Sequence, residues 1–440
     1  MKIVLISNLY PNTNEPCRGL YNMHLMQAMR EAGHAVEIIA PTAYLPGRDK
    51  PPPLTETWNG IPVYHPRYYY TPGFFIQHHW RMYRHAVAPL LRRQTEGQRL
   101  KTEDREHSPQ RTQRTQSETQ DLLSPRRGRD PHPLQKSLQL GRRSPAKRGE
   151  GGSSVFSLQS SSPHVILGFI YPDAVAMAGV CRALGLPYSV RVHGSDFRIR
   201  MQQPRFRPLI MRCLEQAPQI LCPGQALKAD IEKAGIDPGK ITCFNNGIDP
   251  AIFYADGTPR RNEILFVGNL VGVKAPERIL AAFHALADLR SGGLRLVMIG
   301  AGPMRGGLEQ QAARLKIPVD QIEWTGALPQ QEVAQRMRQA KVLCLCSRSE
   351  GMPNVVTEAL ACGCPVVATA VGEIPYMLHA DNGIIVPPQP GDSATIQSLT
   401  AALSQALATP YDPAAIAAGT SEYRWEMAAQ RGGEGLGARL

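Results

Sequence analysis

Two glutamates, Glu350 and Glu358, bracket the stretch of this sequence whose residue types and spacing best suit chemistry. Residues 341–346 form a short apolar run typical of a strand, and residues 354–361 have the spacing of a buried helix. One carboxylate therefore lies in a strand-to-helix loop, shaped by Gly351, and the other lies two turns along the helix. In an α/β sheet, such a loop lies at the carboxyl edge, where a helix N-terminus favours phosphate. The second acid suits a sugar hydroxyl, because it would repel phosphate.

A candidate cation follows another apolar strand, residues 264–267. Gly268 ends this strand and Lys274 stands six residues later. A departing phosphate needs a cation and hydrogen-bond donors where negative charge develops, and a lysine on a flexible stem meets that need. Asn269 between them can donate a hydrogen bond but carries no charge. The alternative is an ordinary surface lysine, which the position after a strand-terminal glycine disfavours.

Three further loops that follow strands hold residues that could contact a ligand. His193 ends the strand 188–192, where an α/β fold places ligand contacts, although a single histidine is often structural. Gly300 opens a turn after another apolar strand, where a glycine commonly just tightens the link from strand to helix. Gly19 ends the loop between the first strand and the first helix. Arg18 beside it is either a phosphate contact or an exposed side chain.

The stretch around Glu350 resembles a known family signature. It resembles the Glu-x7-Glu motif of retaining glycosyltransferases of family 4, of the bacterial teichuronic-acid and exopolysaccharide type. The resemblance rests on the context Ser347-x-x-Glu350-Gly351-x-Pro353 and Glu358-Ala359-x-Ala361-x-Gly363. It implies a GT-B fold, an α/β architecture in which two Rossmann-like domains face each other across a cleft.

The resemblance also implies roles for the candidate residues. Glu350, His193 and Lys274 would act on the donor sugar and the leaving group, and Glu358 would contact ribose hydroxyls. The remaining nucleotide contacts would come from Gly19, Gly268, Asn269, Gly300, Gly351, Met352 and Asn354.

The chain departs from the family pattern at three places. Asn269 stands where the family usually has arginine, Ala275 stands where it has glycine, and Gly19 is single where the family has a pair. Relatives of the teichuronic-acid type have a similar Gly-Asn-Leu form.

The implied reaction moves a sugar from a UDP- or GDP-sugar to a glycan or lipid-linked acceptor with retention of configuration. The acceptor would attack from the face of departure, and a phosphate oxygen of the leaving group would accept its proton. The resemblance implies neither a metal nor a cofactor. The alternative is a non-catalytic nucleotide-sugar-binding protein with an impaired site, motivated by the departures from the pattern.

Strand-like and helix-like patterns alternate along the 440 residues, which predicts parallel sheets covered on both faces. We expect an acceptor-side domain over residues 1–255 and a nucleotide-sugar-binding domain over residues 256–420. Residues 421–440 are expected to form a helix that crosses back to the first domain.

Residues 94–162 interrupt the pattern and are expected to be disordered. They are rich in Arg, Gln, Ser and Pro and lack periodicity, so they cannot offset their ordering entropy by apolar burial. Residues 92–150 hold fifteen Lys and Arg against eight Asp and Glu. This surplus of seven positive charges is more than half of the net charge of +12. A nucleic-acid-binding arm is disfavoured, because no aromatic residues are interleaved for base stacking.

Composition also bears on where the protein is located and on whether it binds zinc. No run of eighteen apolar residues exists, and the first residues are too short an apolar run for a secretory signal, so we expect a cytoplasmic protein. Nine cysteines without Cys-x-x-Cys spacing indicate buried thiols rather than a zinc site.

Residues 66–93 interleave aromatic residues with arginines. Either they dock on an anionic membrane surface, or the aromatic residues pack inside the first domain. The residues concerned are Tyr68, Tyr69, Tyr70, Phe74, Phe75, Trp80 and Tyr83, with Arg67, Arg81, Arg84, Arg92 and Arg93.

Overall fold

A computed structural model describes residues 1–16, 18–44, 51–69, 78–106, 162–243 and 245–430. By internal contacts the chain divides into two units, Met1–Thr95 with Ser160–Leu440, and Glu96–Gln159. Both large sheets belong to the first unit.

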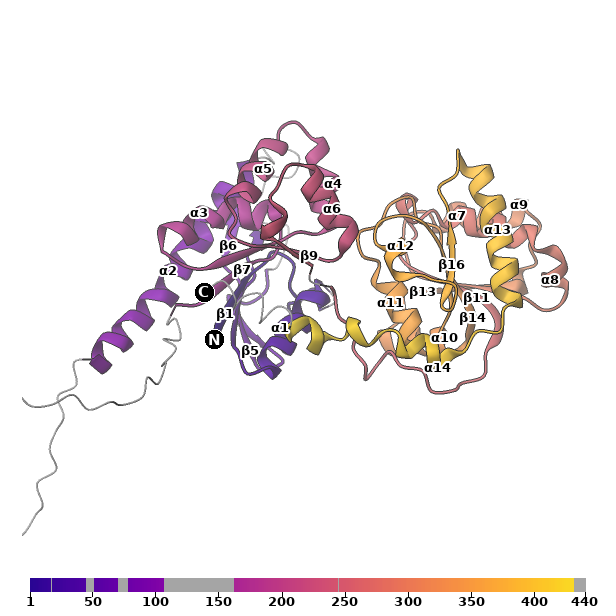
Figure 1. The fold of residues 1–440 in the computed structure, drawn as a ribbon, viewed down its shortest axis with the longest axis horizontal. Helices are drawn as coiled ribbons and strands as arrows, with labels where there is room; N and C mark the ends of the chain where they lie inside the picture. The colour runs from indigo at the N-terminus through magenta and orange to yellow at the C-terminus, as the bar shows by residue number, and fades with distance from the viewer. Residues whose placement is uncertain (17, 45–50, 70–77, 107–161, 244, 431–440) are drawn as a thin grey trace, which may run out of the picture. The chain divides into compact units, whose positions relative to one another are not determined.

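The first large sheet has eight strands in the order β10-β9-β8-β7-β1-β2-β5-β4 (Figure 1). Its strands are β1 (Lys2–Ile6), β2 (Ala35–Ile39), β4 (Thr55–Trp58), β5 (Ile61–Tyr64), β7 (His164–Leu167), β8 (Tyr188–Arg191), β9 (Ile220–Cys222) and β10 (Ile241–Cys243). All neighbours pair in parallel except β4 and β5. Val4 and Ile6 enter one apolar core while Ile3 and Leu5 enter another, the alternation of a strand buried on both faces.

Helices cover both faces of this sheet. They are α1 (Leu20–Glu31), α2 (His79–Glu106), α3 (Val175–Ala183), α4 (Gly194–Arg198), α5 (Arg207–Gln216) and α6 (Gln225–Lys233). Side chains of α2, α3 and α5 fill the core on one face, and side chains of α1 fill the core on the other. Trp425, Ala428 and Ala429, from the helical residues 425–430, pack into the same core as α1.

The second large sheet has six strands, all parallel, in the order β13-β12-β11-β14-β15-β16. They are β11 (Arg261–Val267), β12 (Arg295–Ile299), β13 (Ile322–Gly326), β14 (Ala340–Leu345), β15 (Val366–Thr369) and β16 (Gly383–Val386). Numbered within the sheet, this is the order 3-2-1-4-5-6 of a Rossmann fold.

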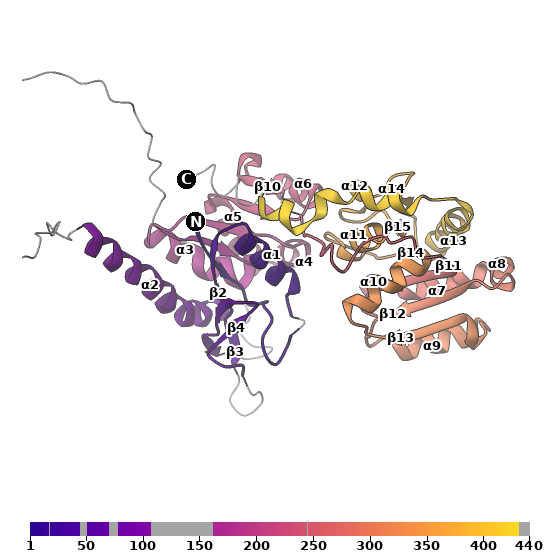
Figure 2. The ribbon, with the colours of Figure 1, turned by 90° about the horizontal axis from the view of Figure 1, so that it is seen from below.

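Figures 1 and 2 show helices on both faces of the second sheet. They are α7 (Pro276–Ala285), α8 (Ala287–Ser291), α9 (Arg305–Arg314), α10 (Gln330–Gln339), α11 (Asn354–Ala361), α12 (Ile374–Met377), α13 (Asp392–Ala408) and α14 (Pro413–Ala418). One large core cluster joins all of these helices except α8 to the strands. The predicted strand–helix alternation with parallel sheets is therefore confirmed.

A hairpin that the sequence analysis missed extends the first sheet. Strands β4 and β5 are joined by Asn59 and Gly60, which have φ angles of 49° and 75°. Two residues with positive φ make the turn that suits a two-residue hairpin, and Asn-Gly is its usual sequence. This dipeptide between two alternating segments was the available signal. A further pair, β3 (Thr42–Tyr44) with β6 (Arg67–Tyr69), lies outside both large sheets.

The prediction of disorder from residue 94 onward is wrong at its start. Helix α2 continues to Glu106. Tyr83, Val87 and Leu91 recur every four residues and are fully buried, so they anchor the helix. Once anchored, a helix propagates readily through residues with good helix propensity such as Arg, Gln, Glu and Lys. Residues 107–161 of the predicted disordered segment lie outside the described residues.

Candidate active site

The candidate residues of the second sheet gather at its switch point. Strand β11 pairs with β12 on one side and with β14 on the other, so the chain direction of the crossovers reverses between β11 and β14. Ligands bind at such a point, beyond the carboxyl ends of the strands. Lys274 lies seven residues beyond the end of β11, and Glu350 lies five residues beyond the end of β14.

Lys274 and Glu350 form an ion pair, with 2.6 Å between Lys274 Nζ and Glu350 Oε1. Ser347 Oγ donates a hydrogen bond of 2.5 Å to the same carboxylate oxygen. The Glu350 side chain is 9% exposed and the Lys274 side chain 24%, so the pair is shielded but reachable from solvent. A negatively charged ligand approaching Lys274 would compete with Glu350 for the ammonium group.

The backbone around Lys274 explains why a glycine suits position 275. Ala275 has φ 48° and ψ 46°, the left-handed conformation, and it precedes Pro276 at the start of α7. This conformation costs a non-glycine residue about 1–2 kcal/mol. Cys346 Sγ donates to Ala275 O at 2.9 Å and Arg348 N donates to Val273 O at 2.8 Å, so the loops after β11 and β14 are held together.

The loops after β11 and β12 touch through glycines. A Cβ atom on Gly300, which has φ 139°, would lie 1.9 Å from Gly268 O, so no other residue fits there. Gly268 N donates to Ile299 O at 3.0 Å. Asn269 is exposed beside them. Gly268, Asn269 and Gly300 therefore lie together at the same sheet edge as Lys274.

Helix α11 begins at Asn354, directly after the Glu350 loop, with Pro353 in an extended conformation as its N-cap. Gly351 and Met352 in the loop are partly exposed. Glu358 lies one helical turn beyond Asn354, rather than the two turns expected from the sequence. It is partly exposed, and among the described residues no side chain donates a hydrogen bond to it. Desolvation raises the pKa of Glu358 to about 7.

The raised pKa of Glu358 predicts a pH-dependent stability. Between the ordinary carboxyl value and about 7, the folded chain holds a proton that the unfolded chain has lost, so stability falls as pH rises through this window. Glu358→Gln should flatten the fall of Tm with pH, measured by calorimetry. Glu332→Gln, at an exposed site on α10, is the matched control and should leave the slope unchanged. Equal slopes for Glu358→Gln and the wild type would contradict the prediction.

His193 follows β8 in the first sheet and is held by its surroundings. Its Nε2 lies 3.0 Å from Gly168 O, and its ring stacks on Phe169 with 4.3 Å between centroids. Since a carbonyl only accepts, Nε2 carries the proton and Nδ1 is left as an acceptor. Desolvation, helped by Arg191, lowers the pKa of His193 to about 3. The imidazole is therefore neutral near pH 7 and suits accepting a hydrogen bond rather than carrying charge.

Asp196, three residues after His193, was given no role in the sequence analysis. Its Oδ1 accepts a hydrogen bond of 2.7 Å from His193 N, and its Oδ2 accepts one of 3.2 Å from Ile170 N. It thus joins the loops after β8 and β7. Desolvation raises the pKa of this buried carboxyl to about 7.

Gly19 caps the start of α1 in the left-handed region, with φ 63°. A Cβ atom there would lie 2.4 Å from Leu9 O, so glycine is required for packing. Arg18 forms an exposed ion pair of 2.5 Å with Glu15. Both interpretations of Arg18 stay open, because its side chain is 36% exposed and its Nε is buried without a hydrogen-bond partner.

A buried polar chain that the sequence analysis missed leads to α11. Arg191 Nη1 donates to Asn22 Oδ1 at 2.6 Å, and Arg191 Nη2 approaches Asn246 Oδ1 at 3.5 Å. Asn246 Nδ2 in turn donates to Asn354 Oδ1 at 3.0 Å. No single-residue pattern marks such a chain, because its members are far apart in the sequence.

The loops that carry His193 and Glu350 also touch. A Cβ atom on Gly194 would lie 2.9 Å from Gly351 Cα, and Arg198 Nη1 donates to the backbone carbonyl of Glu350. Small residues at positions 194 and 351 permit this backbone approach. The structure therefore brings the Lys274–Glu350 pair, the start of α11 and the His193 loop into one neighbourhood.

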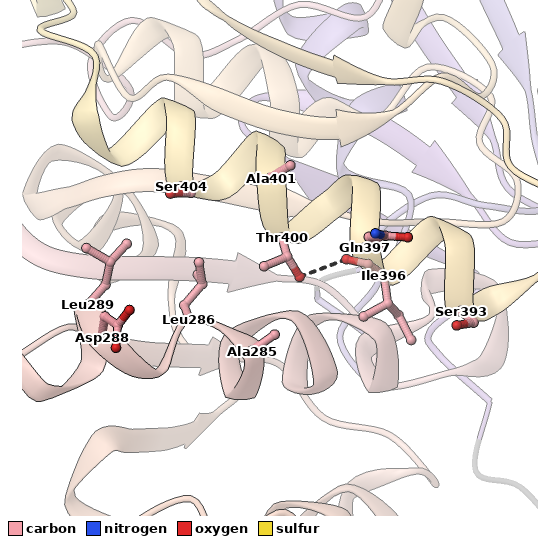
Figure 3. Close-up of a pocket in the computed structure, with 10 residues that line it drawn as sticks. All are labelled: Ala285, Leu286, Asp288, Leu289, Ser393, Ile396, Gln397, Thr400, Ala401 and Ser404. Atoms are coloured by element: carbon pink, nitrogen blue, oxygen red, sulfur yellow. Dashed lines mark hydrogen bonds between the residues drawn. The ribbon is translucent and has the colours of Figure 1, made fainter.

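A groove of about 620 Å³ lies elsewhere, between α7, α8 and α13 (Figure 3). It is lined by Ala285, Leu286, Asp288, Leu289, Ser393, Ile396, Gln397, Thr400, Ala401 and Ser404. None of the candidate site residues is among them. The groove is therefore separate from the strand ends that carry the candidate site.

Neither a metal cluster nor a membrane span is found in the part of the chain that the structure describes. No group of three or more His, Cys, Asp or Glu side chains there could hold a metal ion. No helix there is long and apolar enough to cross a membrane.

Known proteins resemble this chain in both halves. A family model for a glycosyl transferase 4-like domain matches residues 19–247, and one for glycosyl transferases group 1 matches residues 261–409. A Bacillus subtilis protein described as a teichuronic acid biosynthesis glycosyltransferase, TuaC, is 23% identical over 415 residues, covering 88% of this chain and 86% of that protein.

Two further comparisons bear on length and fold. The uncharacterized glycosyltransferase MJ1178 of Methanocaldococcus jannaschii is 27% identical over 218 residues, which is 49% of this chain and 59% of that protein. The matched region therefore spans less than two thirds of that relative. The crystal structure of Anabaena Alr3699/HepE in complex with UDP-glucose superposes with a TM-score of 0.62 at 14% identity, covering 100% of both chains.

Proposed function

Since this chain belongs to the glycosyl transferase 4-like family and has the GT-B fold, we propose that it transfers a sugar from a nucleotide-sugar donor to a glycan or lipid-linked acceptor. The family resemblance and the two Rossmann-like sheets expected from the sequence are confirmed. The donor class is supported by the UDP-glucose complex of the Anabaena protein, which shares the fold. We further propose that configuration at the anomeric carbon is retained.

The observation that carries the proposal is the Lys274–Glu350 pair at the switch point of the second sheet. A GT-B donor needs a cation at its leaving diphosphate and a polar group at its sugar. Lys274 supplies the charge that offsets the departing phosphate. Glu350, freed from the lysine, accepts hydrogen bonds from sugar hydroxyls. The start of α11 adds backbone donors and a positive dipole end for phosphate.

The other residues bind and orient the donor. Glu358 accepts hydrogen bonds from ribose hydroxyls, and its raised pKa means that this interaction strengthens as pH rises through about 7. His193 accepts a hydrogen bond from the donor sugar at Nδ1, since its Nε2 proton is engaged by Gly168. The acceptor hydroxyl attacks from the face of departure, its proton passes to a phosphate oxygen of the leaving group, and the new glycosidic bond forms as the sugar–phosphate bond breaks.

The test is transfer with a panel of UDP- and GDP-sugars, preselected by thermal shift, because ligand stabilisation grows with affinity. We expect one donor to stabilise the chain, and we expect its product to keep the donor's anomeric configuration by NMR. An inverted product would overturn the retaining assignment. Donor binding without transfer or donor hydrolysis would favour the alternative, a non-catalytic nucleotide-sugar-binding protein.

Two of the aromatic residues in the stretch 66–93 pack inside the first domain. Tyr68 and Tyr83 are buried, with ring centroids 5.3 Å apart, so the core interpretation describes these two. Tyr69 is exposed. Residues 70–77, with the predicted aromatic anchors Tyr70, Phe74 and Phe75, lie outside the described residues. Binding to a membrane surface would therefore depend on the other residues of this region.

Three arginines gather around one cavity near this region. A cavity of about 240 Å³ between α2, α3 and α5 is lined by Arg84, Arg182 and Arg212 together with Trp80, and its lining residues include no carboxylate. Arg84 and Arg212 are exposed. Arginines beside an amphipathic ring attract anionic lipid headgroups. We therefore propose that this face binds the anionic surface of a membrane that presents the acceptor.

Binding to anionic vesicles should depend on these arginines. The double variant Arg84→Glu/Arg212→Glu should lose co-sedimentation with phosphatidylglycerol vesicles at low salt, because it reverses two charges at the cavity. Arg261→Glu/Arg314→Glu, exposed in the second half of the chain, is the matched control and should bind like the wild type. Equal binding by both variants, or wild-type binding to neutral vesicles only, would overturn the proposal.

A further inference from the structure

Two cysteines face each other at the edge of the first sheet. Cys222 is the last residue of β9 and Cys243 the last residue of β10, and the two are direct partners in the parallel register. Strand β10 is the edge strand of the sheet. Partner residues on neighbouring strands share a face, and the strands lie about 4.8 Å apart. That spacing falls within the range of about 4.4–6.8 Å between Cα atoms of disulfide-bonded cysteines.

The two neighbouring thiols differ in their access to solvent. As direct partners on paired strands, they place their side chains next to each other. Cys222 is 1% exposed and also lies 3.6 Å from Gly224 O, whereas Cys243 is partly exposed. A reagent from solvent therefore reaches Cys243 first, with Cys222 directly behind it.

Their acidities differ in the same sense. The neighbouring Cys222 thiol lowers the pKa of Cys243, with a smaller contribution from Lys228, while burial and the nearby Glu373 and Glu232 oppose it. The pKa of Cys222 is raised, first by the neighbouring Cys243 and then by burial. Burial raises the pKa of the other cysteines that the structure describes, Cys181, Cys213, Cys344, Cys346, Cys362 and Cys364. A thiolate, the reactive form, therefore forms most readily at Cys243.

We propose that Cys222 and Cys243 are a peroxide-sensitive thiol pair that closes to a reversible disulfide. The Cys243 thiolate attacks one oxygen of a hydroperoxide, the O–O bond breaks, and a sulfenic acid forms at Cys243. The Cys222 thiol then attacks that sulfur, the S–S bond forms and water leaves. The two sulfurs lose two electrons to the peroxide, which is reduced to water or to an alcohol and water. A dithiol reductant reverses the step.

The pair lies beside contacts that a disulfide would constrain. Gly224, two residues beyond Cys222, would place a Cβ atom 2.3 Å from the carboxyl carbon of Glu373. Glu373 accepts hydrogen bonds of 2.8 and 2.9 Å from Gln225 N and Ala226 N at the start of α6. The modification site is thus in a packed segment rather than in a freely exposed loop.

The test uses the full chain with Cys17→Ser, since Cys17 lies outside the described residues and would add a ninth thiol. After treatment with hydrogen peroxide and alkylation, non-reducing digestion and mass spectrometry should find the Cys222 peptide linked to the Cys243 peptide. Two thiols per chain should be lost, and dithiothreitol should restore them. Cys181→Ser, which removes a buried thiol on α3, is the matched control and should leave the link unchanged.

Single variants locate the first step. Cys222→Ala should leave a sulfenic acid at Cys243 that dimedone traps, and Cys243→Ser should abolish both the link and the trapped species. The native circular dichroism spectrum of each variant is checked first, and the linked peptide in the Cys17→Ser protein decides the proposal by itself if a variant is unfolded. The proposal would be overturned if Cys222 and Cys243 were both still alkylated, and so not linked, after peroxide treatment. A link that forms only in denaturant would also overturn it.

Discussion

Replacing Lys274 by alanine is expected to lower kcat about 150-fold, because removal of one preorganised charge-stabilising group costs about 3 kcal/mol of transition-state stabilisation. The ammonium group is the cation that the structure places beyond the carboxyl end of β11, beside Glu350. The measurement is initial rate with the donor identified by thermal shift. KM for the donor should rise less than kcat falls, since charge on the phosphate grows only as the leaving group departs.

Two controls separate this effect from general damage. Lys233→Ala, an exposed lysine at the end of α6, should keep wild-type rates. Excess magnesium should not rescue Lys274→Ala. Rescue by the metal, or wild-type kcat in Lys274→Ala, would show that the leaving group is stabilised in another way.

Glu350→Ala is expected to lower kcat by one to two orders of magnitude, about 1.4–3 kcal/mol, while affinity for the free nucleoside diphosphate stays the same or rises. The reason is the ion pair: without the glutamate, the Lys274 ammonium is no longer held at 2.6 Å by a carboxylate and is free to bind phosphate. Isothermal titration with UDP and GDP, combined with initial rates, measures both effects.

Glu358→Ala is expected to have the opposite effect on nucleotide binding. Glu358→Ala should weaken nucleotide binding, because it removes the acceptor for ribose hydroxyls rather than the partner of Lys274. Glu332→Ala on α10 is the matched control for loss of a carboxylate and should change neither quantity. Weaker UDP binding in Glu350→Ala than in Glu358→Ala would reverse the proposed roles.

Local sequence signals predicted elements and strand ends well. Apolar runs placed β8, β11 and β14 within a few residues, because buried parallel strands need continuous apolar residues. A local signal was also present but unused at Asn59-Gly60. The length of α2 was missed because the tail of a helix depends on the anchoring of its first turns, by Tyr83, Val87 and Leu91.

Pairings between distant residues could not be predicted in this way. Lys274 and Glu350 are 76 residues apart, and Arg191 and Asn22 are 169 apart. The Cys222–Cys243 contact depends on the register of two short strands. Such contacts follow from strand order and register, which residue spacing along one segment does not contain.

The sequence by itself determined that two α/β halves exist, that Glu350 and Lys274 each follow a buried strand, and that a family signature surrounds them. These are properties of neighbouring residues, because periodicity and turn chemistry act over a few positions. Only the tertiary structure decided that β11 and β14 are neighbours at the switch point of the sheet. That adjacency joins the lysine to the glutamate, since the carboxyl ends of parallel strands meet at one edge, and it turns two separate candidates into one site.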